Sequence, residues 1–100
     1  MAYQSVNPAT GETVKTFQPH DQQKINQTLE RAQSLYKSDW SHYDNLEKRT
    51  AVLAKFADLL IEQQDQIATT MATEMGKLHA QGKSEVELCA KIARYYSDNA

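Results

Sequence analysis

The sequence contains few of the residues that cross-link or interrupt a chain. Among its 100 residues are one cysteine, two prolines and three glycines. The single cysteine, Cys89, cannot form an internal disulfide, and the usual structural zinc sites need cysteine pairs that this sequence lacks. This cysteine content is typical of a reducing compartment.

An excess of one charge and long apolar runs are also missing. Eleven Lys and Arg are scattered among thirteen Asp and Glu, so no basic stripe is present to neutralise successive phosphates. No apolar run has the length of a membrane span, and the first residues lack the basic and apolar segments of a signal or transit peptide. We therefore expect no nucleic-acid partner, no membrane partner and a cytoplasmic localisation.

Residues 3–17 predict a short β-hairpin. Val6 precedes a turn-forming run from Asn7 to Gly11, and β-branched and aromatic residues follow from Val14 to Phe17. An isolated hairpin is only marginally stable in water. We therefore expect this one to lie against helices or to extend a sheet of a larger protein.

The remainder of the sequence predicts about four helices, over residues 21–37, 45–62, 65–75 and 80–98. Asp21 is the expected N-cap of the first. Asp44 and Glu47 have the spacing of a capping box at the start of the second. The apolar residues recur at helical spacing in each, and in the second helix they form a row of Val52, Leu53, Phe56, Leu59 and Leu60.

The two later helices carry further signals. Gly76 is placed to close the third helix in the left-handed conformation. The last helix has a wide apolar arc between Val86 and Tyr96, which predicts burial on several sides. No C-cap glycine, proline or basic last turn follows it, so we expect that the remainder of the same chain continues beyond Ala100.

From about Val6 onward, the succession of these elements resembles the amino-terminal region of the aldehyde dehydrogenase superfamily. The resemblance rests on landmarks in order along the chain: Asn7-Pro8-Ala9-Thr10-Gly11-Glu12, Trp40, Arg49, Leu53, Leu59-Leu60, Glu74-Met75-Gly76-Lys77, Glu85-Val86 and Arg94-Tyr95-Tyr96. The residues at these landmarks are most similar to those of the bacterial succinate-semialdehyde dehydrogenase branch. One departure is Leu78, where the family usually has proline, so that ending the third helix is left to Gly76 alone.

The resemblance implies an α/β parent enzyme of the aldehyde dehydrogenase fold, with residues 1–100 as the amino-terminal part of its dinucleotide-binding domain. It implies an oxidoreductase that uses a thiolate and NAD or NADP to oxidise an aldehyde, succinate semialdehyde in the nearest branch, to the acid. It also implies a homo-oligomeric parent. The family's nucleophile, base and dinucleotide contacts lie downstream, so we expect no catalytic, cofactor-binding or metal residue within 1–100, and no activity from it alone.

Several residues allow a functional and a structural interpretation. For Cys89, inside an apolar helical pattern, we predict a buried structural side chain and not a nucleophile. Lys77 could bind an anion. We expect instead a structural role, in which its positive charge follows a helix end closed by glycine and interacts favourably with the helix dipole. Three widely spaced histidines, His20, His42 and His79, predict surface or capping roles and not metal ligation.

Aromatic residues raise the same question. Trp40, close to His42 and Tyr43, is expected to fill the corner between two helices. Arg94 with its neighbouring tyrosines is expected to pack with polar tips outward and not to form a cation–aromatic site.

A rival hypothesis is a free-standing helical interaction module. In it, the row of Val52, Phe56 and Leu60 would receive a partner helix. The module predicts a closed core with one open groove and a stop codon directly after Ala100. The enzyme fragment predicts several uncovered apolar faces and a reading frame that continues.

Overall fold

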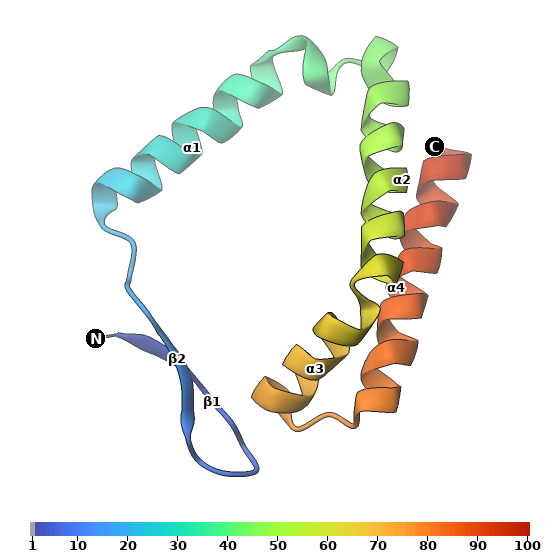
Figure 1. Cartoon of the computed structure of the whole chain (residues 1–100). Coiled ribbons are helices and arrows are strands. Elements are labelled where there is room, and N and C mark those ends of the chain that lie inside the picture. The colour runs from blue at the N-terminus through green and yellow to red at the C-terminus, as the bar shows by residue number, and fades with distance from the viewer. Residues whose placement is uncertain (1) are drawn as a thin grey trace.

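The computed structural model describes residues 2–100, which form a β-hairpin and four α-helices in an open arrangement (Figure 1). The expected hairpin and four helices are confirmed. The elements are β1 (Tyr3–Val6), β2 (Thr13–Phe17), α1 (Gln22–Lys37), the 3₁₀ turns η1 (Asp39–Ser41) and η2 (Tyr43–Asn45), α2 (Leu46–Glu62), α3 (Gln64–Met75) and α4 (His79–Asn99).

The hairpin pairs β1 and β2 in antiparallel order. Tyr3 lies opposite Phe17, and the register is irregular where Ser5 meets Val6. At the tip, the Asn7 N–H donates to the Glu12 carbonyl over 2.9 Å, and the Gly11 N–H donates to the Asn7 carbonyl over 2.8 Å. Gly11 has φ 75°, in the left-handed region that glycine adopts without steric cost. Every residue of β2 is exposed, so the hairpin contributes almost nothing to the core of this chain.

Helix α1 begins as the sequence predicted. The Asp21 carboxylate accepts a hydrogen bond of 2.7 Å from the Lys24 backbone N–H, which satisfies one of the free donors of the first turn. No residue of α1 is buried, although Leu29 and Tyr36 are large and apolar. Within the described residues, α1 therefore has no partner that covers its apolar side.

The start of α2 differs from the prediction. Asp44 lies within η2, the N-cap residue is Asn45, and no side chain caps the helix, so the predicted capping box with Glu47 is wrong. The 3₁₀ turn places Asp44 one position before the cap, where its carboxylate cannot accept from the first turn. Arg49 holds this junction instead: its guanidinium donates to the carbonyl of Trp40 and, over 2.8 Å, to that of His42.

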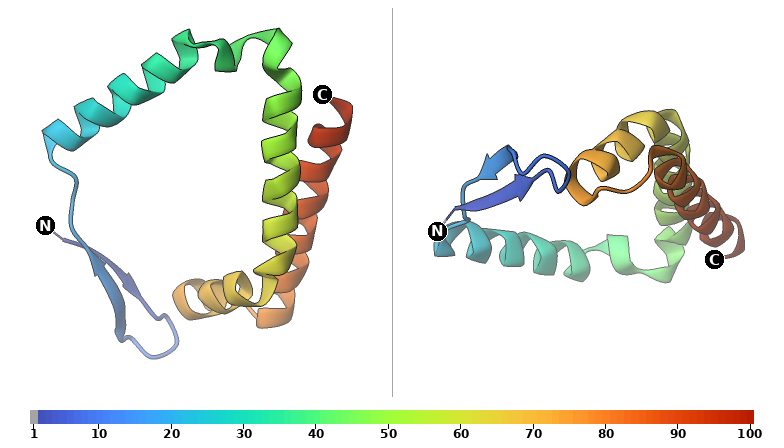
Figure 2. Two further views of the ribbon diagram at one scale, coloured as in Figure 1. Left: turned by 45° about the horizontal axis from the view of Figure 1, so that its top comes forward. Right: turned by 90° about the horizontal axis from the view of Figure 1, so that it is seen from below.

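Packing is concentrated between α4 and the pair α2 and α3, which lie along it (Figures 1 and 2). The buried residues are small: Ala57 of α2, Ala68 of α3, and Gly82, Val86, Ala90 and Ala93 of α4. Small side chains allow helix axes to approach closely. The core of this chain is therefore thin, and Val86 is the largest side chain that is fully buried in it.

The predicted row on α2 is only partly packed. Leu53, Leu59 and Leu60 are half-buried, but Val52 and Phe56 are 58% and 51% exposed. The reason is rotational: α4 approaches α2 along the side that carries Ala57, and Val52 and Phe56 lie on a different side of the helix. Trp40 is half-buried at the junction of α1 and α2, in the corner that the sequence predicted for it.

The turn between α3 and α4 is closed by Gly76. This residue has φ 71° and ψ 15°, and its N–H donates to the Ala72 carbonyl over 3.1 Å, as the left-handed helix end requires. The predicted conformation is confirmed. A β-carbon built on Gly76 would lie 3.2 Å from Cγ of Pro8, so the hairpin tip reaches the end of α3.

The chain is extended for its length. Its radius of gyration is 17.8 Å and its principal extents are 50 × 37 × 14 Å, whereas a compact chain of this size has a radius of roughly 13 Å. Viewed from below in Figure 2, the hairpin and α1 spread away from the three packed helices. Of the helices described for residues 2–100, none is both long and apolar enough to cross a membrane.

Candidate functional site

The described residues bring no metal-binding group together. Within residues 2–100, no cluster of three or more His, Cys, Asp or Glu could hold a metal ion. The three histidines lie apart: His20 precedes α1, His42 lies between the two 3₁₀ turns, and His79 begins α4. Nδ1 of His42 is 3.8 Å from the Asp39 carboxylate, a contact between neighbours on an exposed turn.

Cys89 is exposed, which contradicts the predicted burial. The packed side of α4 carries residues 82, 86, 90 and 93, and Cys89 lies at the border of that side. Its neighbours at the helical spacings of three and seven residues are Ile92 and Tyr96, both large and also exposed. The exposed thiol therefore lies where the packed side of α4 meets an uncovered apolar part of the helix.

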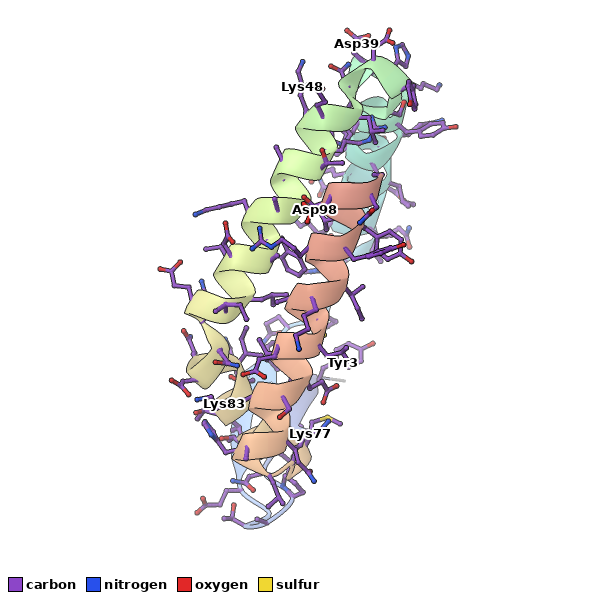
Figure 3. The ribbon with its side chains drawn as sticks, turned by 90° about the vertical axis from the view of Figure 1, so that its right-hand side faces the viewer. Tyr3, Asp39, Lys48, Lys77, Lys83 and Asp98 are labelled. Carbon is purple, nitrogen blue, oxygen red and sulfur yellow. The ribbon has the colours of Figure 1, made fainter. Side chains whose placement is uncertain are left out.

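Lys77 takes a structural partner. Its ammonium forms an ion pair with the Glu85 carboxylate, which ties the turn after α3 to the first half of α4. A second pair joins Nζ of Lys83 to Oδ1 of Asp65 over 3.1 Å, and so links α4 to α3. Figure 3 shows both lysines toward one end of α4, and Asp98 toward the other. Because these basic groups already have carboxylate partners, they do not form a free anion site.

Arg94 contacts an acid and not an aromatic ring. Its guanidinium forms an ion pair with Asp58 of α2, a residue 36 positions earlier. The hydrogen bond and then the charge of Arg94 lower the pKa of the Asp58 carboxyl, and Asp58 raises the pKa of Arg94 by the same two causes. Tyr95 and Tyr96 contact each other edge to face, with ring centres 5.3 Å apart. The sequence missed Asp58, because no local pattern links it to Arg94.

A shallow groove runs along α4 from Glu87 to Asn99, beside Ile61 of α2 and the Arg94 side chain. It encloses about 460 Å³ and opens to the surface. Its lining carries both acidic and basic side chains and comprises Ile61, Glu87, Ala90, Lys91, Arg94, Tyr95, Asp98 and Asn99. Mixed charge on an open surface does not favour an anionic cofactor.

The described residues contain no glycine-rich loop of the kind that binds a dinucleotide. The three glycines, Gly11, Gly76 and Gly82, lie in separate elements, so no glycine-rich loop precedes a helix to receive a pyrophosphate. The only cysteine has no histidine near it in sequence, and it lies inside a helix. What residues 2–100 provide is a set of packed helices with large uncovered apolar surfaces.

Comparison with known proteins identifies the family of this chain. The profile described as "Aldehyde dehydrogenase family" matches residues 1–100. A probable succinate-semialdehyde dehydrogenase (NADP(+)) of Synechocystis sp. is 41% identical over the whole chain, which corresponds to 22% of that protein. A succinate-semialdehyde dehydrogenase (NADP(+)) of Deinococcus radiodurans is 40% identical over 96% of this chain and 20% of its own length.

A solved structure supports the same family. The succinic semialdehyde dehydrogenase of Streptococcus pyogenes, crystallised with NADP+ as the cofactor, superposes with a TM-score of 0.90 at 43% identity, over 97% of this chain and 21% of that one. The chain thus spans about a fifth of the length of the relatives that it matches. Both the profile, which covers every residue, and the shared fold show that this chain belongs to the aldehyde dehydrogenase family.

Proposed function

We propose that residues 1–100 are the amino-terminal part of the dinucleotide-binding domain of an NADP-dependent succinate-semialdehyde dehydrogenase. The observation that carries this proposal is the likeness to the Streptococcus pyogenes enzyme, with a TM-score of 0.90 and 43% identity over nearly the whole chain. The reaction proposed for the complete protein is oxidation of the aldehyde to the carboxylic acid with reduction of NADP. NADP is favoured over NAD because the names of the relatives specify it.

Within that enzyme, we propose that this stretch has a structural role. Two ion pairs join its helices to one another, Asp58 with Arg94 and Lys83 with Asp65. Helices α2, α3 and α4 form a packed unit with uncovered sides, as expected of a flank that supports a sheet from another part of the protein. The complete protein is proposed to be a cytoplasmic homo-oligomer.

The free-standing module is not favoured. It predicts a closed core with one groove, whereas α1 has no buried residue and the hairpin strands are almost wholly exposed. The family profile also spans the entire chain, and the matched relatives are about five times longer, as expected if residues 1–100 are part of a longer enzyme.

The test is a substrate and cofactor comparison on the complete protein. Formation of reduced cofactor is followed with succinate semialdehyde, with an uncharged aldehyde of the same length, and with each cofactor in turn. We expect kcat/KM to be higher by roughly tenfold or more for succinate semialdehyde and for NADP, since a site that binds a charged or polar group rejects analogues without it. Equal or higher values with the uncharged aldehyde would reject the proposed substrate, and equal or higher values with NAD would reject the cofactor preference.

A further inference from the structure

Helix α4 has three different sides. With about 100° of rotation per residue, positions 82, 86, 90 and 93 fall on one side, and these residues are buried against α2 and α3. A second side carries the charged residues Glu87, Lys91, Arg94 and Asp98, all at least partly exposed. The third side, here named the outer apolar face, carries Leu88, Ile92, Tyr95 and Tyr96, with the exposed Cys89 at its edge next to the packed side.

The outer apolar face differs from an ordinary solvent side. Leu88, Ile92, Tyr95 and Tyr96 are 50–60% exposed, although α4 already has a charged side that suits water. A shallow hollow crosses the face and is lined by Lys91, Ile92, Tyr95 and Tyr96. A helix with one packed side and one charged side needs no second apolar side unless a further element covers it.

We infer that the outer apolar face is covered, in the complete protein, by the polypeptide that follows Ala100. This inference rests on the proposed function, in which residues 1–100 are part of a longer dehydrogenase. In the solved relative, nearly all of this fold corresponds to 21% of the chain, so about four-fifths of a longer polypeptide is available to cover it.

The position of the face also favours the same chain over a second copy. Helix α4 ends at Asn99, so residues after Ala100 start about one turn from Tyr95 and Tyr96. A tethered segment meets this face at a high effective concentration, whereas another copy must be bound from solution. The segment that packs there should itself be apolar, because the face has no charge of its own to pair.

The rate at which Cys89 is modified tests whether the outer apolar face is covered. In the complete native protein, modification by N-ethylmaleimide is followed at the peptide that contains Cys89 by mass spectrometry, which separates it from any other cysteine. We expect modification slower by about 100-fold or more than in the unfolded protein, because it requires local opening. Modification at the rate of the unfolded chain would overturn the inference. Protection that disappears on dilution to monomers would also overturn it, in favour of a second copy.

A matched pair of variants tests the face independently. Ile92→Gln puts a polar group on the outer apolar face, and Lys91→Gln puts the same group on the adjacent charged side. We expect Ile92→Gln to lower Tm by several degrees and to speed modification of Cys89, while Lys91→Gln changes neither. If Ile92→Gln does not fold, the labelling of the wild-type protein still decides; if it behaves like Lys91→Gln, the face is not covered.

The same preparation separates this inference from the proposed function. Protected Cys89 in a protein that does not oxidise succinate semialdehyde would reject the substrate and support the covered face. Freely modified Cys89 in a protein that does oxidise it would support the substrate and reject the covered face.

Discussion

A β-carbon placed on Gly82 would lie 3.2 Å from both Cα and Cβ of Ala68, so α3 and α4 approach almost backbone to backbone at this point. The nearest side-chain atom beyond Ala68 is Sδ of Met71, at 3.4 Å. A glycine inside a helix normally costs about 1 kcal/mol relative to alanine. Here it allows a helix crossing that no other residue would permit without movement.

The close approach reverses the usual effect of replacing a helical glycine. Gly82→Ala in the complete protein should lower the free energy of unfolding by about 1–2 kcal/mol, because overpacking against backbone outweighs the gain in helix propensity. Urea unfolding measures the change. Ser84→Ala, at an exposed position of the same helix, is the control and should stay within about 0.5 kcal/mol of wild type. A Gly82→Ala protein more stable than wild type would contradict the close contact.

Gly76→Ala should destabilise the complete protein by about 1 kcal/mol or slightly more, because a β-carbon is disfavoured at φ 71°. Gly11→Ala provides the comparison: Gly11 also has positive φ, but a β-carbon there would have no neighbour within 4 Å, whereas one on Gly76 would meet Pro8. Urea unfolding of both variants should show the larger loss for Gly76→Ala, and Pro8→Ala should recover part of it. Equal losses would show that the contact with the hairpin tip has no energetic weight.

The Asp58–Arg94 pair predicts a small pH-dependent contribution. Because the folded-state pKa of Asp58 lies below its ordinary value of 3.8, the stability from this carboxylate is present above pH 3.8 and is lost as pH falls through the lowered pKa. Asp58→Asn should therefore lower Tm slightly at neutral pH and by less at pH 3, and added salt should reduce the difference. Asp98→Asn, whose charge is only a minor influence on Arg94, is the control. A difference that grows toward acid pH would contradict the pairing.

Cys89→Ala should leave turnover of the complete enzyme nearly unchanged. The thiol lies on an apolar helix face with no reacting group beside it, so its removal costs only packing against whatever covers that face. Steady-state kinetics and a melting curve give the two readings. Loss of turnover at an unchanged Tm would assign Cys89 a chemical role.

The sequence was sufficient for elements defined by local chemistry. Asp21 caps α1 and Gly76 closes α3, because capping and left-handed turns depend on one residue and its near neighbours. The prediction from sequence was wrong where the surrounding structure determines the local conformation. Asp44 has the spacing of a cap, but the 3₁₀ turn η2 shifted the helix start past it.

Burial and pairing show the same limit. Apolar spacing on α2 predicted contact for Val52 and Phe56, but the small side chains of α4 selected the side of Ala57 instead. Cys89 was predicted to be buried because it lies within an apolar helical pattern and free cysteine is usually buried. The wide apolar arc of this helix does not show which part of it the other residues of this chain cover, and Cys89 is exposed. The partner of Arg94 is distant in sequence, so only the fold could identify Asp58.

We propose that residues 1–100 supply scaffold and apolar surfaces to a larger enzyme, and no reacting groups. The most direct test of this claim is the purified 100-residue polypeptide, assayed for NADP and NAD reduction with succinate semialdehyde and tested by sedimentation and binding of a hydrophobic dye. We expect no turnover, because the proposed function assigns to the remainder of the complete protein the thiolate, oxyanion donors and nicotinamide site that aldehyde oxidation needs. We also expect association and dye binding through the uncovered faces. Turnover that persists in a Cys89→Ala preparation after further purification, or a monodisperse monomer with a cooperative melt and no dye binding, would contradict the claim.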